Sequence, residues 1–408
     1  MALSLYDGIT WSCEVGFDHG PLVTSPTWYD VTADVKRVSI KGGGISGDFG
    51  DSDAGTFSVD LANDGDALRR YDPTYAAGTY YGRLLPGRQL RIRVTVPNPS
   101  TTYDLCRGPV DGWDQRWQQP SGSTVTLTGS DMLGVLAQTP YTPSGGIVSA
   151  DTAIGLILDQ ASWPAGLRSI GSPASTVVDM SALSGSIAEA LRTVARTEQG
   201  RLYVDGAGAV QFRPLTWALT NATTTTSAAT YGDGASDLPL GADFELFDGG
   251  RWIYNRVDVQ GAVAADATSA AAYLSRGVSI SSAHPTDSER PESFAAWILG
   301  RTKDPHPRPG QIVIRPRMDT TQTLVPRSGF TGLFHALGYV PGQRITAARR
   351  PANTAVISIP FLVERISHDF DARDWVMAIE PGPVTNVNGE TYAAWDTSTW
   401  DGGHVWAP

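Results

Sequence analysis

Cysteine is nearly absent from this chain of 408 residues, which holds only Cys13 and Cys106. Two cysteines cannot build a disulfide framework, and they cannot supply all four ligands of a structural zinc site. The six histidines are scattered, and no two of them stand at a metal-ligand spacing such as H-x-x-x-H. The sequence therefore predicts no metal site and no other cofactor, and it indicates a chain that folds in a reducing cytoplasm.

Long apolar runs are also missing. No stretch approaches the roughly 18 uninterrupted apolar residues that a membrane-spanning helix needs. Residues 1–16 lack the basic start and the apolar core of a secretory signal peptide. We therefore expect neither a membrane span nor secretion.

Recognisable catalytic patterns are absent as well. The run Gly42-Gly43-Gly44-Ile45-Ser46-Gly47 matches G-x-G-x-x-G, but the following DFGDSDAG does not begin a helix, so the match does not favour a nucleotide site. His368, next to Asp369, is the most suggestive single residue, but it has no evident nucleophile partner. We predict a protein that is not an enzyme. A glycosidase remains an alternative, because the positions of its two catalytic carboxylates are defined in the folded structure and not by a sequence pattern.

Basic residues are outnumbered. Thirty-one Lys and Arg stand against 42 Asp and Glu, for a formal net charge of −11. Proteins that bind nucleic acid tightly usually carry a basic surface patch, so tight DNA binding is not expected. An acidic surface would instead let DNA slide past by like-charge repulsion.

Glycine and proline are plentiful, with 44 and 27 residues. Together they exceed the roughly 12% of average usage, which favours many turns and a β-rich fold. The region 54–96 shows the pattern best. Its first strand alternates Phe57, Val59 and Leu61 with polar residues, and its last strand, 90–96, alternates in the same way. A period of two places the apolar residues on one face of each strand.

A loop of more than twenty residues joins these two strands and carries four tyrosines, Tyr71, Tyr75, Tyr80 and Tyr81. Long loops within compact β units usually have a function of their own. Tyrosines supply large contact area at low entropic cost, so we predict that the loop docks onto a neighbouring subunit. The alternative is a surface loop whose tyrosines cover the mouth of a barrel.

Helical signals appear mainly in the middle of the chain. Ser130 or Asp131 is expected to cap a short helix, MLGVLAQ, and Asp151 and Ser186 are expected to cap two longer ones. A β-hairpin is expected around Asp205-Gly206. Residues 216–240 include the polar run NATTTTSAATYGDGAS and are interpreted as a linker.

The order of these patterns carries a resemblance. AGTFSVDLAND, an Asp-Pro loop, a Pro-Gly turn and a strand ending in RIRV are followed by YDLCRGPVDGWDQRW, VTLTGSDMLGVLA and, near the far end, PGQRI and FLVERISHDFDARDWVMAIEP. In this order they resemble tail hub proteins of long-tailed phages, which in actinobacterial phages are called minor tail proteins.

The resemblance implies a mainly β fold with two β-barrel-like hub domains at 1–145 and 241–385. It also implies a helix–helix–hairpin α+β domain at 146–215, between the first barrel and the linker 216–240. Residues 386–408 would be an extended C-terminal arm. They contain Trp395, Trp400 and Trp406 and no Lys or Arg, and exposed tryptophans are typical of interface anchors.

By the same resemblance, the chain would be a homotrimer that closes the tail tube and forms a channel for DNA ejection. Its partners would be the distal tail protein, the end of the tail tube, the tape measure protein and other minor tail proteins. It would be made in the bacterial host cytoplasm and located in the virion, at the tail tip. Three alternatives remain: the hexameric distal tail ring protein, a tail-tip cell-wall hydrolase and a carbohydrate-binding module.

Overall fold

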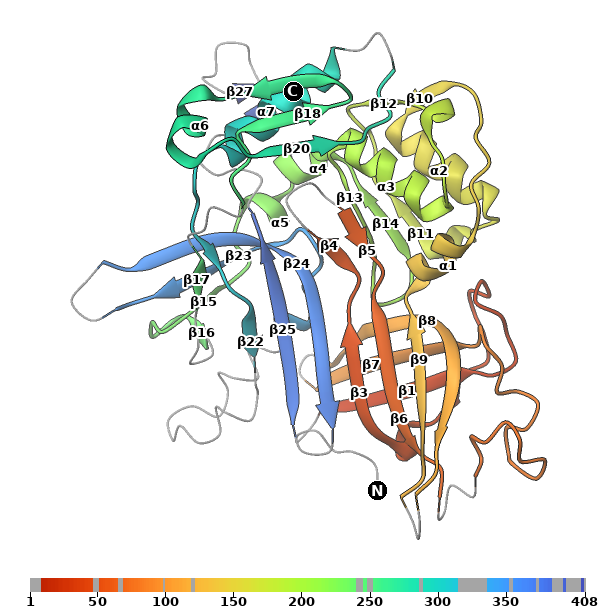
Figure 1. The fold of residues 1–408 in the computed structure, drawn as a ribbon. Helices are drawn as coiled ribbons and strands as arrows, with labels where there is room; N and C mark the ends of the chain where they lie inside the picture. The colour runs from red at the N-terminus through yellow and green to blue at the C-terminus, as the bar shows by residue number, and fades with distance from the viewer. Residues whose placement is uncertain are drawn as a thin grey trace.

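The computed structural model describes residues 9–46, 51–64, 69–97, 100–118, 122–239, 245–247, 252–285, 289–314, 336–351, 355–371, 374–383, 392–393 and 405–406. Within these residues the chain is mainly β, as expected, and most of its strands belong to one large sheet (Figure 1).

The N-terminal third supplies one half of this sheet. The predicted alternation is confirmed, because Phe57, Val59 and Leu61 are buried while the residues between them face outward. Strands β4 (Gly44–Ser46) and β5 (Asp51–Asp53) form a separate short hairpin, which lies above β3 in Figure 1. The strands are β1 (Thr10–Gly16), β2 (Tyr29–Asp30), β3 (Val35–Lys41), β6 (Thr56–Ala62), β7 (Gln89–Pro97), β8 (Ser100–Arg116) and β9 (Thr124–Ser130).

Strands between residues 230 and 382 supply the other half. Among them, the long strand β24 pairs with β3, from Ser367 opposite Lys41 to Asp371 opposite Arg37. This pairing makes one continuous sheet whose order is β16-β15-β23-β24-β3-β6-β9-β8-β7-β1-β2, with β25 and β22 branching from β24. The strands are β15 (Thr230–Gly232), β16 (Leu238–Pro239), β22 (Ile312–Ile314), β23 (Arg344–Arg349), β24 (Ile357–Asp371) and β25 (Trp375–Gly382).

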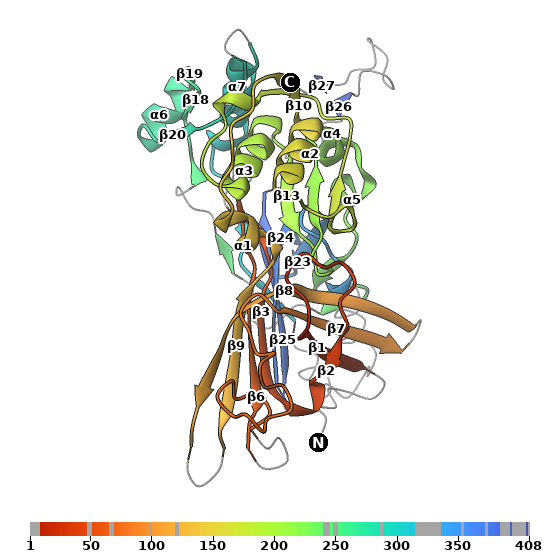
Figure 2. The ribbon, with the colours of Figure 1, turned by 90° about the vertical axis from the view of Figure 1, so that its right-hand side faces the viewer.

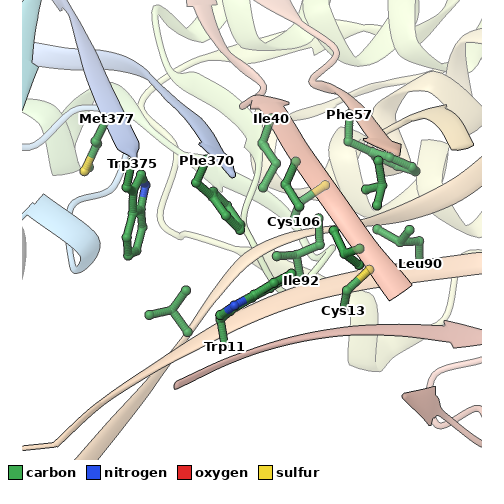
Figure 3. Close-up of a cluster of buried hydrophobic side chains, with 14 of the residues drawn as sticks. Trp11, Cys13, Ile40, Phe57, Leu90, Ile92, Cys106, Phe370, Trp375 and Met377 are labelled. Atoms are coloured by element: carbon green, nitrogen blue, oxygen red, sulfur yellow. The ribbon is translucent and has the colours of Figure 1, made fainter. Parts of the chain in front are cut away.

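The expectation of two barrels needs correction. The described strands do not close into a barrel, and the two β units share both a sheet and a core. Figure 3 shows Trp11 and Ile92 from the N-terminal unit lying close to Phe370 and Trp375 from the C-terminal unit. The rings of Trp11 and Phe370 meet edge to face, with centroids 5.2 Å apart. Burial of each such ring is worth several kcal/mol at about 25 cal/mol per Å², which ties the two units together.

The α+β unit lies above the N-terminal strands (Figure 2). The helix at 132–138, expected within the first domain (1–145), packs instead into the core of this unit. Asp131 caps it by accepting from the Leu133 amide, and Ser186 caps a later helix, both as predicted. Ser186 also forms a capping box with Glu189. The second helix begins after Ser149 and not after Asp151, which lies inside its first turn. The elements are α1 (Met132–Gln138), β10 (Ile147–Ser149), α2 (Ala150–Gln160), β11 (Arg168–Ile170), β12 (Val177–Asp179), α3 (Ile187–Glu198) and the predicted hairpin of β13 (Arg201–Val204) and β14 (Val210–Arg213).

Residues 216–240 were expected to be a linker, and the described residues among them, 216–239, are folded. Residues 216–220 belong to helix α4 (Leu215–Thr220). The residues after them form α5 (Ala222–Thr225), β15 and β16. Tyr231 is completely buried, and its hydroxyl donates to the Tyr339 hydroxyl at 3.2 Å. The polar composition predicted a linker, but the threonine hydroxyls donate to backbone carbonyls of their own short helices, as Thr220 does to Thr216.

A satellite unit, formed by the described residues between 252 and 303, packs beside the α+β unit. Its three-stranded sheet is covered by one long helix and encloses its own small core. Its elements are β18 (Arg256–Val259), β19 (Ala262–Ala265), α6 (Ala267–Tyr273), β20 (Gly277–Ile280) and α7 (Arg290–Thr302). Two further pairs are β17 (Leu246–Phe247) with β21 (Arg308–Pro309), and β26 (Tyr392–Ala393) with β27 (Val405–Trp406). No described helix is both long and apolar enough to span a membrane.

Candidate interaction surface

The tyrosine loop connects two strands with different neighbours. Strand β6 pairs with β3 and β9, whereas β7 pairs with β1 and β8. The loop thus crosses from one part of the sheet to another, and residues 69–88 of it are described. Residues 69–88 form no helix or strand, so side chains must hold them in place.

Four aromatic rings form a continuous stack beneath the loop. Tyr80 lies between Tyr71 and Phe17, with ring centroids 5.6 and 4.0 Å away. Phe17 in turn stacks on Trp113 at 5.8 Å. Such pairs contribute about 0.5–1.5 kcal/mol each beyond their area burial. The stack therefore fixes the loop onto the end of the N-terminal unit.

Tyr71 is the most deeply fixed member of the loop. Its ring is completely buried, and its hydroxyl donates to a carboxylate oxygen of Asp34 at 2.6 Å. Burial and this hydrogen bond to Asp34 raise the pKa of Tyr71 far above its ordinary value. Its amide donates to Asn63. Tyr71 is therefore not available to a neighbouring subunit, contrary to the expectation, and its role in the structure is to anchor the loop.

The exposed part of this region lies elsewhere on the loop and directly after β8. Tyr81 is 52% exposed and Trp117 53%. The guanidinium of Arg69 lies over both Tyr75 and Trp117, with 4.4 and 5.1 Å from its carbon to the two ring centroids. We call Arg69, Tyr75, Tyr81 and Trp117 the loop patch. Of the four predicted interface tyrosines, Tyr81 is the one with most of its surface in water.

The tryptophans of the C-terminal arm cannot be placed in the same way. Trp395 and Trp400 lie outside the described residues. Trp406 ends strand β27, which pairs in parallel with β26, so two parts of the arm lie side by side. Their role at an interface stays a prediction.

The two adjacent tyrosines offer a matched test. We expect Tyr80→Ala to lower the free energy of unfolding by about 2–3 kcal/mol, because it empties the middle of the aromatic stack. Tyr81→Ala should change it by less than about 0.5 kcal/mol, as an exposed substitution does. Urea unfolding followed by tryptophan fluorescence measures both. Equal losses in the two variants would contradict this division of roles.

The glycine run of the sequence has a packing role. A Cβ atom on Gly42, Gly43 or Gly44 would come closer than 3.0 Å to an oxygen of Ile366, Asp131 or Glu364, respectively. The run therefore passes between strand β24 and the cap of α1, where only glycine fits. Its described residues lead into strand β4.

A cavity of about 100 Å³ lies at this junction, where the N-terminal unit, the α+β unit and the C-terminal unit meet. His368 lines it and is 6% exposed, and its Nδ1 has no hydrogen-bond partner. Burial lowers the pKa of His368 to about 4. Asp131 also lines the cavity, and burial raises its pKa to about 6 although the amides of Gly55 and Leu133 donate to it.

We looked among the described residues at the junction for an arrangement typical of catalysis and found none. His368 contacts the ring of Trp375, with centroids 5.9 Å apart, and no carboxylate of the described residues bonds to its imidazole. Burial raises the pKa of the Cys106 thiol well above its usual range, which suppresses the nucleophilic thiolate. Among the described residues no group of three metal-ligating side chains is found.

Comparison with known proteins gives likeness of fold. No protein-family model and no curated protein sequence matches this chain. The 43 kDa tail protein of prophage MuSo2 from Shewanella oneidensis has a similar structure, with 12% identity and a TM-score of 0.52 over 91% of this chain and 96% of that one. The tail protein from Neisseria meningitidis MC58 has 12% identity and a TM-score of 0.56 over 92% and 96%. The chain thus has the fold of these phage tail proteins over nearly its whole length.

Proposed function

We propose that this chain is a structural protein of a phage tail tip and that it forms the hub of that tip. The observation that carries the proposal is the extent of the shared fold: two phage tail proteins match it over 96% of their own length. At 91% and 92% of this chain, the shared fold extends over both β units and the α+β unit. The similarity is therefore not limited to one common domain. The order of strand and turn motifs in the sequence supports the same function.

The proposed hub is a homotrimer located in the virion. Its N-terminal unit (1–145) and C-terminal unit (241–385) supply two β modules per subunit, which suits a ring below the six-fold tube. The hub closes the tail tube, joins the distal tail protein to other minor tail proteins and opens for DNA ejection. The loop patch and the tryptophans of the arm 386–408 are its proposed contacts. The net charge of −11 suits a channel through which DNA passes without sticking.

Three-fold assembly is the first test of this proposal. We expect native mass spectrometry of the purified chain to show a species of three times its mass of 43.4 kDa. The hexameric distal tail ring, the main alternative, predicts six copies. A monomer at micromolar concentration in every buffer would contradict both.

The proposed role is mechanical, so we expect no wall-degrading activity. Zymography on bacterial cell walls, with the purified chain in the gel, should show no clearing. Clearing that disappears in His368→Asn, or after mutation of a single carboxylate, would make the chain a tail-tip hydrolase instead.

A further inference from the structure

The satellite unit is joined to the α+β unit by a short connector. Its own helices and strands pack mainly on one another. The connector, residues 281–285, follows β20 and reaches the α+β unit. There Ala283 is completely buried in the core, its amide donates to the Thr197 hydroxyl at 2.8 Å, and its carbonyl accepts from the Asp179 amide at 2.9 Å. The connector therefore links two separate cores.

His284, the next residue, fixes the connector to the satellite unit. It is 3% exposed, and its ring lies edge to face with that of Phe294 in the satellite core, with centroids 6.4 Å apart. Its carbonyl accepts from the amide nitrogen of Gln260 at 3.0 Å. Among the described residues, neither Nδ1 nor Nε2 of its imidazole has a hydrogen-bond partner. Buried polar groups are nearly always paired, so this bare imidazole indicates a role beyond packing.

The charges around His284 do not favour an imidazolium. Arg290, at the start of α7, is the charged group that acts on the imidazole, and it carries the same sign. Arg301, Lys303 and Asp304 lie at the opposite end of α7. The other charged side chains of the elements packed against the connector are exposed or bonded elsewhere: Asp179, Arg196, Glu198, Asp258, Glu289 and Glu292. A proton on His284 would therefore create a buried charge without an acceptor, which is costly.

We infer that His284 is a proton-sensitive latch. As a neutral imidazole it holds the satellite unit against the α+β unit. When it is protonated it leaves its site and releases the satellite unit, while the cores of both units stay folded. Exposed hydrogen bonds also cross between the units, from Arg196 to the Ser281 carbonyl and from Arg290 to the Ser175 carbonyl, but they enclose no core. The inference goes beyond the proposed hub function and does not depend on the number of copies.

The direction of the pH effect follows from where the proton binds more tightly. Burial and the guanidinium of Arg290 lower the pKa of His284 from 6.5 to about 4. An imidazole in the released connector regains its ordinary pKa, so the released state binds the proton more tightly. The latch is at full strength above pH 6.5 and weakens as the pH falls towards 4. Between pH 7 and pH 4.5 the ratio of released to latched molecules should rise about 60-fold.

The test is hydrogen exchange of the full chain at pH 7 and pH 4.5, measured by mass spectrometry of overlapping peptides and corrected for the intrinsic effect of pH on exchange. The amide of Ala283 reports release, because it donates from the connector to Thr197 of the α+β unit. Its protection should fall by about 60-fold. The amides of Leu191 in α3 and Val257 in β18 should stay more protected than that of Ala283, because both cores remain folded.

His284→Phe keeps an aromatic ring at this position but takes up no proton, so its Ala283 amide should stay protected at pH 4.5. Where phenylalanine does not fit, His284→Leu repeats the test. His368→Phe is the matched control, because it removes the buried histidine of the main sheet and should leave the fall at Ala283 intact. An equal fall at Ala283 in His284→Phe overturns the latch. Loss of protection in both cores to the level of Ala283 also overturns it, because acid would then unfold these units as a whole.

Discussion

Gly43→Ala should lower the free energy of unfolding by about 3 kcal/mol. The new methyl group would meet the carboxylate of Asp131, which accepts from the Gly55 amide at 2.6 Å and from the Leu133 amide at 2.9 Å. Displacing this carboxylate breaks charge-assisted hydrogen bonds that contribute about 1.5–3 kcal/mol to the free energy of unfolding. Overpacking lowers this free energy by about a further 1–3 kcal/mol. The two amides hold the carboxylate in place, so it cannot move away from the methyl group without breaking at least one of these hydrogen bonds.

A double-mutant cycle isolates the cause. Asp131→Ala removes the carboxylate and makes room for the methyl group, so Gly43→Ala should cost much less in that background. Gly145→Ala is the control, because a Cβ atom there meets no heavy atom within 4 Å. Chemical denaturation of the four chains of the cycle gives the coupling energy. An equal cost of Gly43→Ala in both backgrounds would contradict the steric explanation.

Acidification from pH 6.5 to pH 4 should destabilise the chain by several kcal/mol. Burial lowers the pKa of both His368 and His284 from 6.5 to about 4, and the guanidinium of Arg290 adds to the effect at His284. The unfolded state therefore binds protons in this range that the folded state does not, and stability falls as pH falls. At 1.36 kcal/mol per pKa unit, each histidine contributes roughly 3 kcal/mol.

Asp131 opposes this trend. Its pKa in the folded chain is about 6, raised by burial from 3.8, so the folded state takes up a proton first and gains up to roughly 3 kcal/mol as pH falls through the same range. The net expected loss is then about 3–4 kcal/mol. His368→Phe and His284→Phe should each flatten the dependence of unfolding free energy on pH, and the double variant should reverse its sign. A double variant with the slope of the unmodified chain would contradict the assignment.

Local signals in the sequence predicted local structure well. The alternation of Phe57, Val59 and Leu61 specified β6 and its buried face, and the Ser186 cap with Glu189 three residues later specified the start of α3. Both depend on neighbours within a few residues, and short-range physics suffices to fix them.

Long-range pairing could not be read in the same way. The pairing of β24 with β3 joins residues more than 300 positions apart, and no period or turn residue indicates it. The expectation of two separate barrels failed for this reason. The tyrosine loop shows the same limit, because the stack with Phe17 and Trp113 decides which tyrosines are buried.

The number of copies in the virion tests the central claim most directly. Quantitative mass spectrometry of purified particles, with isotope-labelled peptides of this chain and of the capsid protein as standards, counts its copies per particle. The hub predicts three. Six copies would instead indicate the distal tail ring, and an absence from particles that are otherwise complete would contradict a structural role in the tail.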